Sequence, residues 1–118
     1  MPQSFVDKNE DEIIGDAISG NLSDFKPGGH ENINRLKTVI GQEFDNAITD
    51  NEAALRRLTG NVRKEADGLR KYIGELKRKK ARIISKINSD SVKYTDEIET
   101  RLTWKPPPTN YSSKSKAT

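Results

Sequence analysis

The chain has 118 residues, of which 31% are hydrophobic and 33% are charged, and it contains no cysteine. An ordinary globular domain is about 45–50% apolar, so this sequence lacks the material for a large hydrophobic core of its own. The lack of cysteine excludes a disulfide framework and any cysteine-based zinc site. Such a chain can remain partly disordered, become elongated, or bury its apolar residues against copies of itself or other partners.

Two features of the sequence bear on location. No apolar run reaches the roughly 20 residues that a membrane span requires. The first residues, MPQSFVDKNEDEII, are acidic, whereas a signal peptide begins with a basic segment. The sequence therefore predicts a soluble protein without a signal peptide or transmembrane segment, located inside cells or inside an assembled particle.

The net charge of +3 conceals a strong asymmetry along the chain. Residues 1–54 carry four Lys or Arg and eleven Asp or Glu, a net charge of −7. Residues 55–86 carry twelve cations and three acids, a net charge of +9. Such a chain can fold back on itself, pair head to tail with a copy, or offer its basic part to a polyanion.

The first expected element is a short helix over about residues 9–19, within an acidic N-terminal arm of residues 1–29. Three acids at positions 10–12 occupy its first turn, where the helix dipole favours negative charge. Ile14 and Ile18 share one face of this helix because they are four residues apart. A Pro-Gly-Gly sequence then interrupts helical structure before the next element.

A helical apolar pattern without proline runs through residues 31–88 and can be followed on to residue 103. Three places could interrupt it: a capping box near residue 49, Gly60-Asn61, and a cluster of cap-forming residues near 89. The apolar phase continues through the first two places and slips at the third. The sequence therefore predicts an all-α, elongated protein of coiled-coil or helical-bundle type, with one long amphipathic helix in the region 30–104, a short N-terminal helix and extended tails.

A heptad frame covers residues 44–87. The first position of the heptad is apolar in six successive repeats, from Ile48 to Ile83. The fourth position of the heptad is less consistently apolar, and it is occupied by Lys79 and Lys86 in the last two repeats. In a parallel dimer, each of these lysines would face the same lysine of the other chain, and the like charges would repel. An antiparallel arrangement, a larger bundle or packing on another protein would instead bring acids to these lysines. The acid-rich first 54 residues are one source. The residues expected at the helix-packing interface are Phe44, Ile48, Leu55, Leu58, Val62, Ala66, Leu69, Tyr72, Ile73, Leu76, Ile83 and Ile87.

Two cations follow the first residue of each of four successive heptads and form a basic ribbon that points away from the apolar stripe. Two interpretations stay open: a solvated outer face, or contact with phosphates or an acidic partner. Binding to nucleic acid would be independent of base sequence and strongly dependent on salt. The residues assigned to such contact are Arg56, Arg57, Arg63, Lys64, Arg70, Lys71, Lys77, Arg78, Lys79, Lys80 and Arg82.

The C-terminal segment 105–118 has three prolines at positions 106–108 and ends in a Ser/Lys-rich tail that we expect to be flexible. Trp104 precedes it, at the end of the helical region. A tryptophan in this position is either a local cap contact or an anchor for a partner.

No catalytic motif is visible. His30 is the single histidine, and the glycines match no nucleotide-binding motif, so we expect no enzyme activity, metal, cofactor or small-molecule substrate. The expected function is that of a structural or adaptor subunit that oligomerises with itself or docks by its apolar stripe in a larger complex, such as a virion. The alternative is a helical protein that binds nucleic acid through the basic ribbon, residues 56–86.

Overall fold

A computed structural model describes residues 5–103, and this part of the chain contains helices and no strand. The expected all-α class is confirmed. The elements in chain order, with η denoting a 3-10 helix, are η1 (Phe5–Asp7), α1 (Glu10–Gly20), η2 (Leu22–Asp24), α2 (Asn32–Arg57), α3 (Arg63–Ser89) and α4 (Ser91–Thr103). Trp104 and the segment 105–118, to which the sequence analysis assigns an anchor and a tail, lie outside the described residues.

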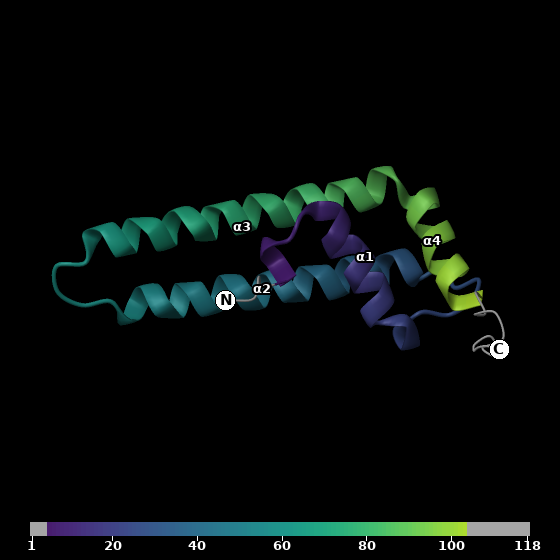
Figure 1. Ribbon diagram of the computed structural model, residues 1–118, viewed down its shortest axis with the longest axis horizontal. Coiled ribbons are helices and arrows are strands. Elements are labelled where there is room, and N and C mark those ends of the chain that lie inside the picture. The colour runs from purple at the N-terminus through teal and green to yellow at the C-terminus, as the bar shows by residue number, and fades with distance from the viewer. Residues whose placement is uncertain (1–4, 104–118) are drawn as a thin grey trace, which may run out of the picture.

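Helices α2 and α3 run antiparallel and form a long hairpin that lies along the longest axis of the molecule, whose extent is 64 Å (Figure 1). The expectation of one continuous helix through Gly60 is therefore wrong, because α2 ends at Arg57 and α3 begins at Arg63. Gly60 has a φ of 78°, a left-handed conformation that glycine adopts more readily than residues with a Cβ atom. The chain reverses direction at this glycine.

Periodicity could not reveal this turn, because the apolar spacing of seven from Leu55 to Val62 is the same on both sides of it. A single straight helix would leave its apolar stripe in water, whereas the reversal buries much of that stripe within the chain. The other two candidate breaks follow the sequence analysis. Helix α2 passes through Thr49 without interruption, and α3 ends at Ser89.

Helix α1 begins at a capping arrangement around Asn9. The Asn9 side-chain oxygen accepts a hydrogen bond from the Glu12 backbone N–H at 2.8 Å, and the Asn9 amide donates to the Glu12 carboxylate. These bonds satisfy groups that the first helical turn would leave unpaired. The opposite face of α1 buries Ile13, Ile14 and Ile18.

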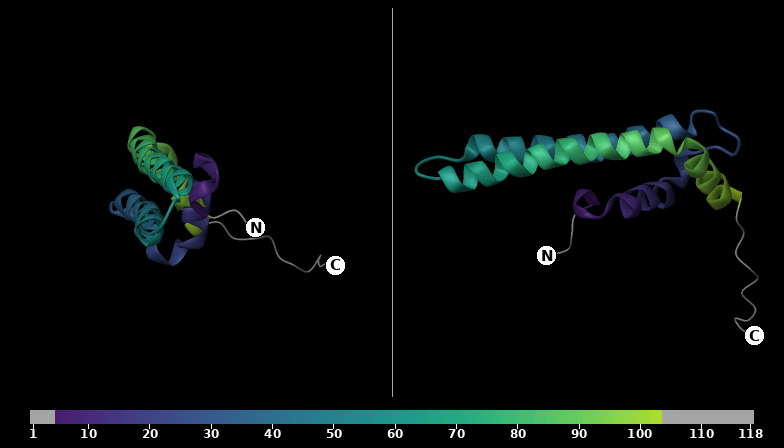
Figure 2. Two further views of the ribbon diagram at one scale, coloured as in Figure 1. Left: turned by 90° about the vertical axis from the view of Figure 1, so that its left-hand side faces the viewer. Right: turned by 90° about the horizontal axis from the view of Figure 1, so that it is seen from above.

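The hydrophobic core lies at one end of the hairpin, where α1 and α4 cover α2 and α3 (Figures 1 and 2). Tyr94 and Ile98 of α4, four residues apart, are buried there. The largest fully buried side chains are Ile13, Ile14, Ile18, Leu36, Ile40, Phe44, Leu76, Ile83, Ile87 and Ile98. This end of the hairpin, which we call the proximal half, is therefore a small helical bundle.

The other end of the hairpin, residues 51–72, projects beyond α1 and α4 as two helices and their connecting turn (Figures 1 and 2). We call it the distal arm. Its apolar side chains, among them Leu55, Leu58, Val62 and Leu69, are half-buried, and none is buried fully. Two helices alone cannot cover both sides of an apolar seam.

Replacing Gly60 with alanine distinguishes a hairpin from a continuous helix, because the free energy of unfolding should change in opposite directions in the two structures. In the hairpin, an alanine held at the left-handed φ destabilises the protein by about 1–2 kcal/mol. In a continuous helix the same replacement would stabilise it by about 1 kcal/mol. We expect Gly60→Ala to lower the free energy of unfolding, measured by urea denaturation.

Gly68→Ala is the matched control, because Gly68 lies inside α3 and an added Cβ would meet no atom within 4 Å. We expect this variant to gain up to about 1 kcal/mol. A gain of stability in both variants would contradict the turn at Gly60.

Candidate docking surface on the hairpin

The cations of α3 divide into two groups with different surroundings. Those in the proximal half, with the exception of Arg78, contact acids or carbonyl groups that belong to the first 54 residues of the chain. Most of those in the distal arm make no such contact. In the proximal half, the basic ribbon therefore contacts acids or carbonyl groups of its own chain, whereas in the distal arm its cations face solvent.

Helix α1 supplies two ion pairs to the proximal group. The Lys86 ammonium lies 2.6 Å from an Asp11 carboxylate oxygen, and the Arg82 guanidinium lies 3.1 Å from a Glu10 carboxylate oxygen. Both acids come from the first turn of α1. The charge at the start of this helix therefore neutralises cations of α3 as well as interacting favourably with the helix dipole.

The sequence analysis expects acids opposite Lys79, but this lysine contacts backbone carbonyl groups instead. Its ammonium donates hydrogen bonds to the backbone carbonyl groups of Val6, at 2.7 Å, and of Lys8, at 2.5 Å. These carbonyls lie where η1 leads into α1. Lys79 thus fixes the backbone of the N-terminal segment against α3.

Helix α2 supplies the remaining partners because the hairpin is antiparallel. Lys80 lies 2.7 Å from Asp45, and Lys77 lies 3.9 Å from Glu52. The sequence analysis names residues 1–54 as a source of acids for the basic ribbon, and these contacts come from that region. All four residues are at least partly exposed, so each pair contributes little stability by itself.

Protonation of the Asp11–Lys86 pair is coupled to folding. The hydrogen bond from Lys86 lowers the pKa of Asp11, and the same bond raises the pKa of Lys86. Burial, by contrast, raises the pKa of Tyr94, whose hydroxyl is buried without a hydrogen-bond partner among the described residues. The first two shifts favour the charged pair that joins α1 to α3.

The distal arm carries a surplus of positive charge. Residues 55–72 contain six cations and two acids, which leaves a net charge of +4. Arg70 lies 3.0 Å from Asp67 on the same helix. Within residues 5–103, the exposed cations of the arm that make no ion pair are Arg56, Arg57, Arg63, Lys64 and Lys71.

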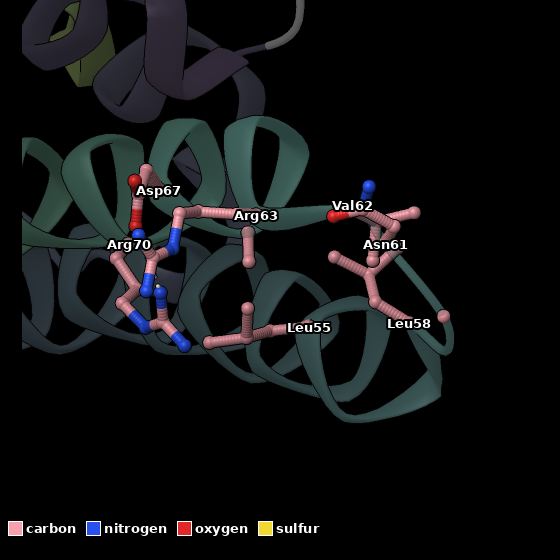
Figure 3. Close-up of a pocket in the computed structure, with 9 residues that line it drawn as sticks. Leu55, Leu58, Asn61, Val62, Arg63, Asp67 and Arg70 are labelled. Carbon is pink, nitrogen blue, oxygen red and sulfur yellow. Dashed lines mark hydrogen bonds and ion pairs between the residues drawn. The ribbon is translucent and has the colours of Figure 1, made fainter.

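A hollow of about 520 Å³ lies at the end of the arm, between α2, the turn and α3. Leu55, Leu58, Val62 and Ala66 line it with apolar groups. Figure 3 shows the Arg63 and Arg70 side chains gathered with Asp67 on the α3 side, while Leu55 and Leu58 approach from α2. The hollow therefore combines apolar walls with a cationic edge.

The structure divides the predicted helix-packing residues into two groups. The six that lie in the proximal half are buried, and they are Phe44, Ile48, Ile73, Leu76, Ile83 and Ile87. The six that lie in or beside the distal arm are half-buried, and they are Leu55, Leu58, Val62, Ala66, Leu69 and Tyr72. The first group packs within the chain, whereas the second group keeps part of its surface accessible, although Leu55 and Tyr72 pack against the core and the Tyr72 hydroxyl donates a hydrogen bond to Asp7.

Sequence reasoning missed the contribution of α4 to packing. Tyr94, Ile98 and the half-buried Leu102 follow one another at intervals of four residues and lie against the core. This spacing is the signal that could have found them. The same reasoning noted Ile14 and Ile18 of α1 but did not place them in the packing interface.

The remaining candidate positions stay outside this surface. His30 is exposed and lies 3.6 Å from the neighbouring Glu31. Arg78, from the basic ribbon, is exposed on α3 beside Gly74.

In the part of the chain that the structure describes, no group of three or more His, Asp or Glu side chains is arranged to hold a metal ion. None of the helices between residues 5 and 103 is both long enough and apolar enough to cross a membrane.

Comparison with models of known families, with curated proteins and with solved structures finds no match to this chain.

The Asp11–Lys86 pair predicts a dependence of stability on pH. Because the pKa of Asp11 is lowered in the folded state, its contribution is present above the ordinary pKa of aspartate. It is lost as the pH falls through the lowered value. We expect the free energy of unfolding to fall less steeply with acidification in Asp11→Asn than in the unmodified protein, as measured by urea denaturation at a series of pH values.

Asp50→Asn serves as the control for this comparison. Asp50 is exposed on α2 and makes no ion pair within the described range. Its replacement should leave the slope with pH unchanged. Equal slopes for Asp11→Asn and the unmodified protein would show that the pair does not couple folding to protonation.

Proposed function

We propose that the protein is a non-enzymatic structural or adaptor subunit that docks in a larger assembly through its distal arm. The observation that carries this proposal is the change in burial along one apolar stripe. The stripe is buried in the proximal half and half-buried in the arm, although the heptad spacing is continuous. Accessible apolar groups gathered on a projecting element are characteristic of a binding surface.

Packing in the proximal half indicates what a partner would add. There, α1 and α4 complete the burial of residues such as Phe44 and Ile83, which are fully buried. In the arm, Leu58, Val62 and Leu69 are half-buried, and α1 and α4 do not extend over this end of the hairpin (Figures 1 and 2). A further helix laid on the arm would exclude water from these side chains and stabilise the complex through apolar burial.

The charge of the arm favours a different protein over a symmetric pair of arms. Two copies placed arm to arm would each bring a net charge of +4 into contact. Like charges in an interface oppose association. Docking on a partner is therefore preferred over self-association through this surface.

A photo-crosslinking amino acid placed at Leu69 tests the docking proposal in cells that naturally produce the protein. Leu69 is half-buried in the arm, so a docked partner would lie within reach of the probe. We expect a discrete protein adduct, identified by mass spectrometry. An adduct with a second copy would favour self-assembly, and an adduct with nucleic acid would favour the second candidate function described below.

The matched control places the same probe at Val92 of α4, which is 75% exposed but lies outside the arm. The proposal requires adducts at Leu69 that are absent at Val92. Equal adducts at both positions, or none at either, would contradict docking through the arm.

The second candidate function is binding of nucleic acid without recognition of base sequence. It is favoured by the five exposed cations of the arm that make no ion pair within residues 5–103. Phosphate groups would neutralise them and release counterions. The candidate surface is narrower than the ribbon of residues 56–86, because several of its proximal cations already contact groups of this chain.

Titration with DNA and RNA across salt concentrations tests this function. We expect an affinity that falls steeply with salt, and the combined change of Arg63, Lys64, Arg70 and Lys71 to glutamine should reduce the salt slope by about four. Arg35→Gln with Lys93→Gln is the control, since both cations are exposed outside the arm. Lack of binding at low salt would remove this candidate.

A further inference from the structure

We infer that the partner of the distal arm is an acidic amphipathic helix of another protein, packed along the hollow formed by Leu55, Leu58, Val62 and Ala66. This inference rests on the proposed docking function and specifies the chemistry of the partner. It follows from how this chain covers its own proximal half, from the charge around the hollow, and from the composition of the segments that could compete for it.

Helix α1 shows what kind of segment covers α3 within this fold. Its first turn contains Glu10, Asp11 and Glu12, and its buried face contains isoleucines at positions 13, 14 and 18. Glu10 pairs with Arg82 and Asp11 with Lys86, while the isoleucines join the core. The covering segment is thus a short helix with an acidic start and one apolar face.

The distal arm presents the same two features, and within residues 5–103 neither α1 nor α4 extends over it (Figures 1 and 2). Its apolar side chains are half-buried around the hollow, and Arg63 and Arg70 stand at its edge (Figure 3). Helix α1 spans Glu10–Gly20, and α3 spans Arg63–Ser89, so α1 covers only part of the longer helix. The uncovered part is the end that carries the excess positive charge.

The other segments of this chain either pack on the proximal half, as α4 does, or lack acids. Glu10 and Asp11 of α1 are already paired with α3, and Glu12 accepts a hydrogen bond from Asn9. The segment 105–118 contains three lysines and no acid, and residues 1–4 contain no charged side chain. Neither can neutralise the arm, and a second arm would add like charge.

The hollow favours a helix over a nucleic acid. A phosphate backbone would meet the cations but would leave Leu58 and Val62 without apolar contacts. It would also approach Glu65 and Asp67, two acids that lie among these cations. An amphipathic helix can place apolar side chains in the hollow and carboxylates opposite the arginines only, and two antiparallel helices offer a groove for a third.

Selection from a displayed library of helical peptides tests the inference with the full chain as bait. The library keeps one apolar face constant and randomises the flanking positions among Glu, Gln and Lys. We expect enrichment of Glu-rich peptides by the unmodified chain. Synthetic peptides of the enriched sequences should bind about tenfold more weakly to Arg63→Gln with Lys64→Gln, by fluorescence anisotropy.

A second bait carries Leu58→Ser with Val62→Ser, and circular dichroism verifies that each variant keeps its helix content. The enriched peptides should also bind this variant about tenfold more weakly, because the apolar contacts of the hollow are lost. Rearranging the apolar residues of a peptide around its helix, at constant composition, should abolish its binding. Arg35→Gln, outside the arm, should leave the affinity unchanged.

Three results would overturn the inference. The first is enrichment of neutral or basic peptides, and the second is equal enrichment of peptides by the unmodified chain and by the Leu58→Ser, Val62→Ser variant. The third is displacement of the peptides by duplex DNA that binds the unmodified chain and the serine variant with the same affinity. The crosslinking experiment keeps the two proposals apart. A protein adduct at Leu69 combined with a neutral or basic peptide preference would retain docking and reject the acidic helix. Absence of any specific adduct would reject both.

Discussion

Antiparallel packing of α2 on α3 brings the acid-rich first half of the chain against the cation-rich second half. Asp45 and Glu52 of α2 meet Lys80 and Lys77 of α3 across this seam. The turn at Gly60 makes the arrangement possible, because a straight helix would carry these charges far apart. Burial of the apolar core, which includes Ile40, Phe44 and Ile83, contributes more stability than the exposed ion pairs, and the ion pairs favour the surfaces that meet.

The difference in length between the helices explains the asymmetry of the molecule. Helix α1 has 11 residues and α4 has 13, whereas α2 and α3 have 26 and 27. The shorter helices therefore cover one end of the hairpin and leave the other as a projecting pair. The same apolar pattern gives a closed core at one end and a half-open seam at the other, and we propose that a partner binds at this seam.

Charge and apolar surface act together in the proposed docking. In the proximal half, the first turn of α1 neutralises Arg82 and Lys86 while its isoleucines enter the core. In the distal arm, Arg63 and Arg70 border Leu58 and the other apolar groups of the hollow. Neither feature alone would specify a partner, because exposed cations attract many polyanions and a small apolar hollow accepts many side chains. Their combination selects a surface that carries both acids and apolar residues.

The sequence by itself determined the helical class, the short N-terminal helix, the end of the long helical region near residue 89 and the division of charge. These features are local: they follow from apolar spacing, capping residues and composition, which neighbouring residues express without reference to the rest of the chain. The tertiary structure decided the turn at Gly60, since the spacing from Leu55 to Val62 suits one helix or two. It also decided which cations are paired, because Lys86 and Arg63 belong to the same ribbon and differ only in what the fold places opposite them. Pairing between distant segments depends on the direction of the chain, and that direction was set by one left-handed glycine.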